Sequence, residues 1–224
     1  VQIDAARRDR RIRDPSLQSE RRNGGLVSAH GADDEARGAV LTDPDLFELS
    51  TSDGCNIRGR VAGPRAAPAV VLLHGGGQSS LSWSRSMREL AARGYRVVAY
   101  DTRGHGNSEW ARDANYSVER MGLDLVEVIS AIEGPICVIG ASAGGLAAFH
   151  GLASRPNAQV RGLIILDIVF RPNEFGTLRI KNFMSFWPEG FETLGQAATA
   201  IGHFEGRPPP DAEKVARNLV QGLD

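Results

Sequence analysis

The stretch PICVIGASAGGLAA, residues 135–148, decides the fold. Its first five residues form an apolar run of strand length, and the residues from Leu146 onward favour a helix. Between them lies a turn in which Ser142 has Gly140 and Gly144 two positions away on either side. The pattern predicts a strand, a sharp turn and a helix. This is the layout of a nucleophile elbow, in which strained backbone lifts a serine hydroxyl off a sheet and glycines allow close packing.

The composition is that of a globular chain with one sizeable core. The 224 residues are 42% hydrophobic and 24% charged, which are ordinary values for such a domain. A net charge of -1 gives no electrostatic reason to expect nucleic acid or an anionic membrane surface as a partner. No apolar run approaches the roughly 20 residues that span a bilayer, and no signal peptide is visible. Cys55 and Cys137 give no disulfide framework, so we expect a cytoplasmic protein.

Residues 1–45 differ from the rest of the chain. Arginines are interleaved with acidic residues, and large apolar side chains are almost absent. We expect this segment to be disordered or a marginal helix. Its acidic residues cancel most of the positive charge, which argues against a nucleic-acid-binding arm.

Strand-like and helical patterns alternate through residues 46–170. The strand-like runs are residues 46–51, 55–61, 69–73, 96–100, 135–139 and 160–168. The first two flank Asp53-Gly54, a hairpin signal. From residue 69 onward, apolar residues at helical spacing separate the runs. We therefore predict an α/β fold: a mainly parallel sheet covered by helices on both faces, with the hairpin as an antiparallel edge.

The alternation stops after Val169. Residues 174–187, 189–201 and 211–221 each favour a helix, with proline breaks between them. Apolar and aromatic side chains concentrate in 175–187, and they suit either a helical core or the lining of a pocket. We interpret residues 171–224 as a helical cap region.

Three motifs follow three consecutive buried strands. They are His74-Gly75-Gly76-Gly77, Asp101-x-Arg103-Gly104-x-Gly106-x-Ser108 and Gly140-x-Ser142-x-Gly144. Together they resemble the α/β-hydrolase fold family over about residues 46–170, in particular its capped esterase and haloperoxidase-like branches. A serine at the apex, where other branches carry aspartate, argues against the epoxide hydrolase and haloalkane dehalogenase branches.

The resemblance implies a role for several residues. Ser142 corresponds to the nucleophile, and the backbone N–H groups of Ala143 and Gly76 correspond to the oxyanion hole. Gly75, Gly140 and Gly144 are the motif glycines that allow close backbone approach.

The rest of the family's catalytic triad has no evident counterpart. The histidines are His30, His74, His105, His150 and His203, and none stands where the family places its base. His74 and His105 belong to loop motifs and are expected to form structural hydrogen bonds. Asp167, at the C-terminal end of the last predicted strand, is the one acid at a plausible triad position. We therefore expect an N-terminal portion of a longer hydrolase, inactive in this form because Ser142 lacks a general base.

The expected function is that of a serine hydrolase acting on small esters or related carbonyl compounds. A cofactor-free haloperoxidase or perhydrolase is an alternative, and a non-catalytic binding module of the same fold is another. The histidines and cysteines lack the spacing of metal ligands, and residues 75–77 lack the Gly-Lys-Ser/Thr of a phosphate loop. We expect no cofactor and no metal, and a small molecule as the partner. An isolated chain would also leave strand 160–168 as an exposed apolar edge.

Overall fold

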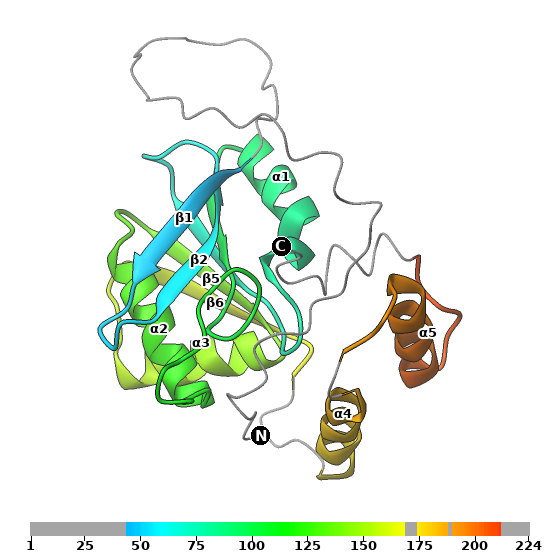
Figure 1. Ribbon diagram of the computed structural model, residues 1–224. Helices are drawn as coiled ribbons and strands as arrows, with labels where there is room; N and C mark the ends of the chain where they lie inside the picture. The colour runs from blue at the N-terminus through cyan, green and yellow to red at the C-terminus, as the bar shows by residue number, and fades with distance from the viewer. Residues whose placement is uncertain (1–43, 169–173, 188–189, 212–224) are drawn as a thin grey trace, which may run out of the picture.

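The computed structural model describes residues 44–168, 174–187 and 190–211. Strands and helices alternate along the chain from β3 to β6 (Figure 1). The strands are β1 (Asp45–Ser50), β2 (Asn56–Ala62), β3 (Ala69–Leu73), β4 (Arg96–Tyr100), β5 (Ile136–Ala141) and β6 (Val160–Leu166). The helices are the 3-10 helix η2 (Ser80–Trp83) and the α-helices α1 (Ser84–Ala92), α2 (Val118–Ser130), α3 (Ala143–Ser154), α4 (Glu174–Phe186) and α5 (Leu194–Glu205).

The strands form one sheet in the order β1-β2-β4-β3-β5-β6. β1 pairs antiparallel with β2, and β2 pairs antiparallel with β4. The pairs β4–β3, β3–β5 and β5–β6 are parallel, with Leu72 opposite both Ala99 and Ile139. Parallel neighbours need crossover connections, which the helices supply. The predicted mainly parallel sheet with an antiparallel hairpin at one edge is confirmed.

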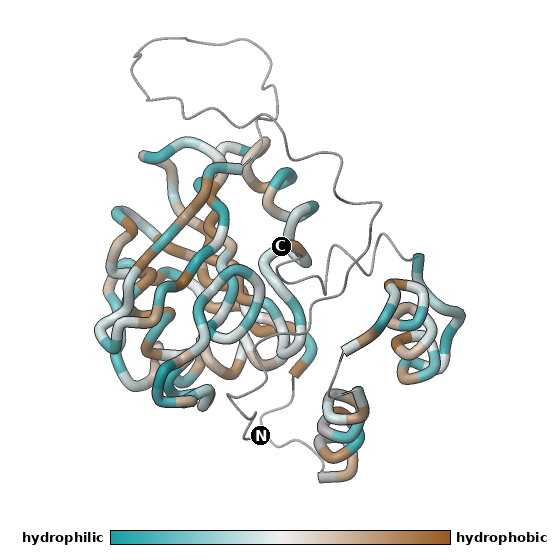
Figure 2. The backbone as a smooth tube through the Cα atoms, in the orientation of Figure 1, coloured by the Kyte–Doolittle hydropathy of each residue, from teal (hydrophilic) through white to brown (hydrophobic). Residues whose placement is uncertain are grey.

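Helices cover both faces of the sheet, so the core has two layers. Successive residues of a strand point to opposite faces. Val71 and Leu73 therefore pack in the layer beneath α2 and α3, whereas Val70 and Leu72 pack with Met87 of α1. All of β3 is buried, which explains its uninterrupted apolar run. Figure 2 shows the same arrangement as hydrophobic segments through the middle of the sheet domain.

Helices α2 and α3 approach each other at a pair of glycines. A Cβ atom on Gly151 would lie 2.3 Å from the carbonyl oxygen of Gly122, and one on Gly122 would lie 2.7 Å from the backbone nitrogen of Gly151. Real Cβ atoms essentially never come that close. The absence of both side chains lets the two helix backbones touch and places α3, which begins at the elbow, against the core.

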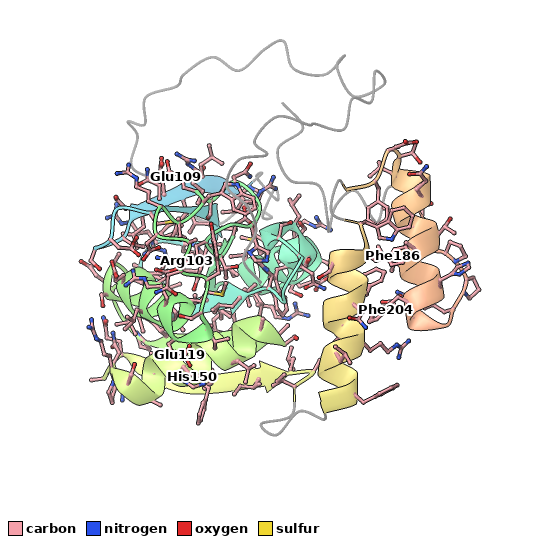
Figure 3. The ribbon with its side chains drawn as sticks, turned by 60° about the horizontal axis from the view of Figure 1, so that its bottom comes forward. Arg103, Glu109, Glu119, His150, Phe186 and Phe204 are labelled. Carbon is pink, nitrogen blue, oxygen red and sulfur yellow. The ribbon has the colours of Figure 1, made fainter. Side chains whose placement is uncertain are left out.

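The edge of the sheet formed by β6, opposite the β1 edge, carries exposed apolar residues. β6 is the outermost strand there, and Ile164 and Leu166 are 46% and 42% exposed, as predicted for this edge. A groove of about 460 Å³ lies between α1 and β6. Helices α4 and α5 lie near this end of the sheet (Figures 1 and 3), where Phe183 stacks on Phe204 with ring centroids 4.3 Å apart.

Two predicted elements have other bounds in the structure. The helix expected over 189–201 runs instead from Leu194 to Glu205. The Thr193 hydroxyl caps its start by accepting a hydrogen bond from the Gln196 N–H, and Gly206 ends it in the left-handed conformation. The strand expected over 160–168 ends at Leu166, because Asp167 has φ 55°.

Some predictions fall outside the described residues. These are the charged segment 1–45, except for its last two residues, and the helix expected over 211–221, except for its first residue. In the part of the chain that the structure does describe, no helix is long and apolar enough to cross a membrane.

Candidate active site

Ser142 occupies a strained turn between β5 and α3. Its φ of 47° and ψ of -118° lie outside the regions that ordinary side chains adopt. Its N–H donates to the carbonyl oxygen of Leu166 in β6 (2.9 Å), and its own carbonyl oxygen accepts from the N–H of Leu146 in α3 (3.0 Å). The turn is thus fixed to the neighbouring strand and to the helix that follows. Ser142 itself is partly exposed.

The elbow glycines are required by close backbone packing. A Cβ atom on Gly140 would lie 2.6 Å from the carbonyl oxygen of Gly144. One on Gly144 would lie 2.4 Å from the carbonyl oxygen of His74. The first contact closes the turn on itself, and the second brings the start of α3 against the end of β3.

The loop after β3 lies against the elbow. A Cβ atom placed on Gly75 would be 3.5 Å from the Cβ of Ser142, and one placed on Gly76 would be 3.8 Å from the Cβ of Ala143. The N–H of Ala143 belongs to the first turn of α3, where backbone donors have no partner within the helix. The structure therefore brings together the four residues that the resemblance assigns to the nucleophile, the oxyanion donors and the loop glycine.

Asp167 lies on the strand beside the elbow. The register pairs Ala141 with Leu166, so Asp167 follows directly on the residue that bonds to the Ser142 N–H. Its side chain is exposed, and its φ of 55° makes it one of three non-glycine residues with positive φ in the described part of the chain. Two of these three, Ser142 and Asp167, thus end neighbouring strands at the same edge.

Both histidines that were predicted to be structural, His74 and His105, have hydrogen-bond partners at both ring nitrogens. The Nδ1–H of His74 donates to the carbonyl oxygen of Gly75 (2.8 Å), and its Nε2 accepts from the N–H of Thr102 (3.0 Å). The Nε2 of His105 accepts from the N–H of Gly77 (3.1 Å), and its Nδ1–H donates to the carbonyl oxygen of Arg103 (3.1 Å). The prediction that these histidines form structural hydrogen bonds is confirmed.

Burial makes both rings neutral at physiological pH. It lowers the pKa of His74 to about 4, and it also lowers the pKa of His105.

The remaining histidines are remote from Ser142 or undescribed. His150 is exposed on α3 (Figure 3), about 12 Å along the helix from Ser142 at about 1.5 Å per residue. His203 lies in the last turn of α5, and His30 falls outside the described residues. Within residues 44–168, 174–187 and 190–211, no histidine forms a hydrogen bond with Ser142.

Comparison with known proteins decides the family. The family model described as "Alpha/beta hydrolase family" matches residues 70–222. This chain belongs to the alpha/beta hydrolase family. A crystal structure of an alpha/beta hydrolase from Novosphingobium aromaticivorans superimposes with a TM-score of 0.67 and 26% identity, covering 79% of this chain and 63% of that one. The family expected from the three motifs is therefore confirmed.

Several curated relatives match part of the chain. Protein phosphatase methylesterase 1 of Bos taurus is 35% identical over 135 residues, which are 58% of this chain and 36% of that protein. The putative carbamate hydrolase RutD of Variovorax paradoxus is 36% identical over 114 residues, 50% of this chain and 42% of that protein. The bifunctional esterase/perhydrolase DCH of Acinetobacter calcoaceticus is 32% identical over 123 residues, 54% of this chain and 44% of that protein. The chain thus spans less than half the length of these relatives.

In this alpha/beta hydrolase, the second motif is a buried framework beneath the loops. One carboxylate oxygen of Asp101 accepts from the N–H of Ser80 (2.6 Å) and the other accepts from the N–H of Asn107 (2.9 Å). The Ser108 hydroxyl donates to the carbonyl oxygen of Asp101. Gly106 has φ 50°, and a Cβ atom there would overlap the Asp101 carboxylate at 2.1 Å. The motif residues therefore hold the loop after β4 and connect it to the start of η2.

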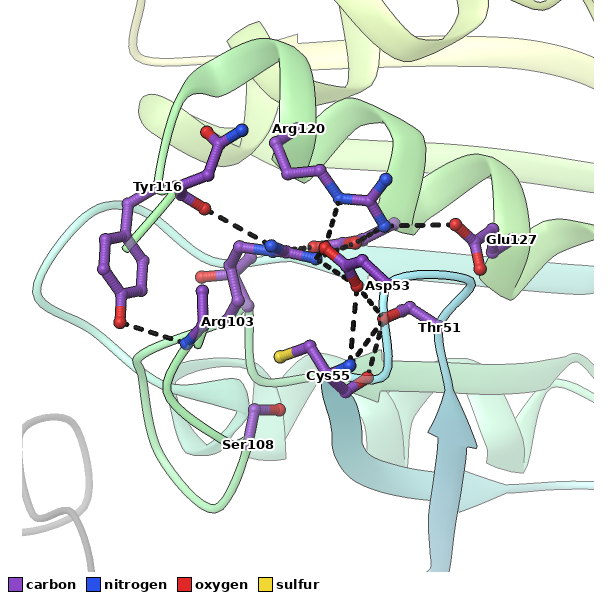
Figure 4. A network of polar contacts seen from close by, with 12 residues as sticks. Thr51, Asp53, Cys55, Arg103, Ser108, Tyr116, Arg120 and Glu127 are labelled. Carbon is purple, nitrogen blue, oxygen red and sulfur yellow. Dashed lines mark hydrogen bonds and ion pairs between the residues drawn. The ribbon is translucent and has the colours of Figure 1, made fainter. Parts of the chain in front are cut away.

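Arg103 is completely buried in a network of ion pairs (Figure 4). Its Nε and Nη2 donate to the two carboxylate oxygens of Asp124, both at 2.7 Å. Asp53, in the hairpin turn, accepts from Nη2 of Arg103 and pairs with Arg120. Burial opposes the charge of Arg103, but its hydrogen bonds to Asp124 raise its pKa above the ordinary value. The bidentate pair neutralises a guanidinium that could not be buried alone.

Sequence reasoning missed the acidic partners of Arg103. Asp124 stands next to the apolar stripe of α2 and is 1% exposed. Glu127, one turn further along the helix, pairs with Arg120 at 3.1 Å and accepts hydrogen bonds from Ser52. An acidic residue beside a buried stripe is a usable signal, because a carboxylate is rarely buried without a cationic partner.

The described residues contain no group of three or more His, Cys, Asp or Glu side chains that could hold a metal ion.

Proposed function

We propose that this chain carries the nucleophile of a serine hydrolase that cleaves small esters through an acyl-enzyme on Ser142. The observation that supports this best is the strained backbone of Ser142, which follows β5 and lies beside the Gly75–Gly76 loop. Such strain persists only where the surrounding structure enforces it, and it concentrates at functional sites.

In the proposed reaction, the Ser142 oxygen attacks the carbonyl carbon of the ester. A C–O bond forms and the carbonyl oxygen becomes an oxyanion. Collapse of this intermediate expels the alcohol, which leaves with the proton that Ser142 gave up. Water then attacks the acyl-enzyme, releases the carboxylic acid and restores the serine.

The oxyanion would be stabilised by the N–H groups of Ala143 and Gly76. They come from the first turn of α3 and from the loop after β3, which lie side by side. The positive end of the α3 dipole adds to this stabilisation. Removal of one such donor in a serine hydrolase typically costs about 3 kcal/mol of transition-state stabilisation.

Proton transfer is the step for which the described residues supply no base. Both nitrogens of His74 and of His105 are already committed to the backbone. We propose that Asp167 is the acid of the triad, beside the elbow, and that it acts only together with an imidazole. Without one, the 224-residue chain is expected to turn over substrate very slowly.

The names of the relatives support a substrate with an ester or carbamate carbonyl group. Their names specify a methylesterase, a carbamate hydrolase and an esterase/perhydrolase. Esters and carbamates both present an sp² carbonyl carbon to a nucleophile. We therefore propose methyl and other short-chain esters as the first substrates to test.

The test is labelling with a fluorophosphonate probe, located by mass spectrometry, across pH 6 to 9. We expect the label on Ser142. Ser142→Ala should abolish it, whereas Ser130→Ala should leave it unchanged, since the Ser130 hydroxyl donates to the carbonyl oxygen of Val126 within α2. Without an imidazole base the labelling rate should rise about tenfold per pH unit, because hydroxide must remove the proton.

Two outcomes would contradict the proposal. Absence of label on Ser142 at every pH would favour a non-catalytic binding module. A rate that levels off above about pH 7 would show that an imidazole titrates in this form of the chain, and the proposed lack of a base would be wrong.

A perhydrolase is the second candidate, because the Acinetobacter relative carries that activity. Hydrogen peroxide would attack the acyl-enzyme instead of water, giving a peracid and free Ser142. Formation of peracid from a short-chain ester and peroxide, lost in Ser142→Ala, would distinguish this activity from hydrolysis alone.

A further inference from the structure

Two histidines, the buried His74 and the partly buried His105, bracket the single residue Gly76. His74 bonds to the carbonyl oxygen of Gly75, and His105 bonds to the N–H of Gly77. These two backbone groups belong to the two peptide units that flank Gly76. The histidines therefore contact the loop on both sides of the proposed oxyanion donor.

The first peptide unit joins Gly75 to Gly76. In a planar trans peptide, the carbonyl of one residue and the N–H of the next point in opposite directions. No peptide bond in the described part of the chain is cis. His74 fixes the Gly75 carbonyl at 2.8 Å, and this contact directs the Gly76 N–H away from the His74 ring.

The second peptide unit joins Gly76 to Gly77. Its N–H, on Gly77, donates to Nε2 of His105 at 3.1 Å. The two dihedral angles of Gly76 describe how these two peptide planes are oriented relative to each other. A glycine has no side chain to restrict them. Fixing both planes from outside therefore restricts an otherwise free residue to one conformation.

Each ring must be neutral and protonated on Nδ1 for these bonds to form. One nitrogen accepts from a backbone N–H and the other donates to a carbonyl oxygen, and a protonated imidazole has no acceptor. The Thr102 hydroxyl lies between the rings, 3.4 Å from Nε2 of His74 and 3.2 Å from Nδ1 of His105. The charged group that faces both rings is Asp101, and the ring centroids are 5.1 Å apart.

The turn that carries Thr102 and His105 is itself fixed. Asp101 precedes it and anchors two backbone N–H groups, and Arg103 within it is bound to Asp124 in the core. The hydrogen bonds of the two histidines thus attach the glycine loop to a turn that is itself held in place.

We propose that His74 and His105 act as a clamp of two positioning residues, which orients the Gly76 N–H toward the oxyanion by fixing the peptide planes on either side of Gly76. This inference rests on the proposed function only for the identity of the oxyanion donor. The clamp itself is a property of the loop and can be tested without turnover.

The first test measures the ring tautomers in the wild-type chain by long-range ¹H–¹⁵N NMR at pH 7. Both rings should be the Nδ1–H tautomer. A ring protonated on Nε2, or on both nitrogens, would overturn the clamp, because that ring could not accept from the backbone. This measurement needs no variant and no activity.

The second test compares His105→Phe with His105→Gln. Phenylalanine keeps an aromatic ring but has no acceptor, whereas the glutamine carbonyl reaches about as far as Nε2. The amide signals of Gly76 and Gly77 should shift in His105→Phe and remain close to wild type in His105→Gln. The rate of Ser142 labelling should fall about 10- to 100-fold in the first variant and about threefold or less in the second. His150→Gln, at an exposed site, is the control.

The outcomes separate the two proposals. If wild-type Ser142 does not label, the proposed function fails, while the tautomers and the glycine amide signals still decide the clamp. If His105→Phe labels at the wild-type rate with unchanged Gly76 and Gly77 signals, the clamp is wrong, even where Ser142 is the nucleophile. If His105→Phe does not fold, His105→Gln decides the clamp. A labelling rate and glycine amide signals close to wild type in His105→Gln would support the clamp, and values far from wild type would contradict it.

Discussion

Gly144→Ala tests how tightly the elbow is packed against β3. Gly144 is the second residue of α3, and a Cβ atom there would lie 2.4 Å from the carbonyl oxygen of His74 and 2.8 Å from the Cβ of Leu73. Contacts below 3.0 Å are essentially never seen, so the backbone of α3 or of β3 must move by roughly half an ångström or more.

Two effects of this substitution oppose each other. Replacing glycine by alanine in a helix gains at most about 1 kcal/mol. Overpacking against a rigid backbone costs about 1 to 3 kcal/mol. The contacts are with a main-chain oxygen and a Cβ atom, which cannot rotate away. The cost of overpacking should therefore exceed the gain in helix propensity. We expect a net loss of about 1 to 2 kcal/mol in the free energy of unfolding, and slower labelling of Ser142 as the start of α3 moves away from Gly76.

The matched control is Gly195→Ala. Gly195 is likewise the second residue of its helix, α5, but a Cβ atom there would meet only the Thr193 hydroxyl, at 3.7 Å. It should leave stability unchanged or raise it slightly. Urea unfolding followed by circular dichroism gives both values. A Gly144→Ala chain as stable as wild type would refute the packing argument.

Two further changes test the buried polar groups. Asp124→Asn leaves the Arg103 guanidinium buried without its carboxylate and should cost about 3 to 5 kcal/mol of unfolding free energy by urea titration, whereas Glu89→Gln, in an exposed ion pair, should change little. The pKa of His74 is lowered from 6.5 to about 4, so the unfolded chain binds a proton there that the folded chain does not. The contribution of His74 to the free energy of unfolding is therefore complete above about pH 6.5 and falls by about 3 kcal/mol as the pH drops toward 4. His74→Asn should lack this part of the pH dependence of stability. An identical pH profile of stability in both proteins would contradict this prediction.

The local sequence pattern was sufficient to predict those elements whose structure is determined within one short segment. The apolar run, the glycines and the helix-favouring residues of 135–148 predicted β5, the turn at Ser142 and α3, because strand and helix periodicities and glycine requirements are read over a few residues. The same holds for the hairpin at Asp53-Gly54 and for the buried strand β3. The predicted range of helix α5 was off by a few residues, because the cap at Thr193 rather than the apolar pattern sets the start of the helix.

Contacts between distant segments lay beyond such reasoning. The sequence motifs named Arg103, but its partners Asp53 and Asp124 come from a hairpin turn and a helix elsewhere in the chain. Likewise His74 and His105 were recognised as loop residues, yet which backbone groups their nitrogens bind depends on how two loops meet at one edge of the sheet.

The sequence by itself determined that this chain presents a serine at a glycine-flanked turn in an α/β sheet, because a short stretch of backbone can adopt that geometry only with those residue types. The tertiary structure decided what surrounds the serine. It placed the Gly75–Gly76 loop beside Ser142 and Ala143. It also engaged the imidazoles of His74 and His105 in hydrogen bonds to the backbone. The physical reason is that hydrogen bonds and burial depend on which groups meet in space, and parallel strands bring together loops that are far apart along the chain.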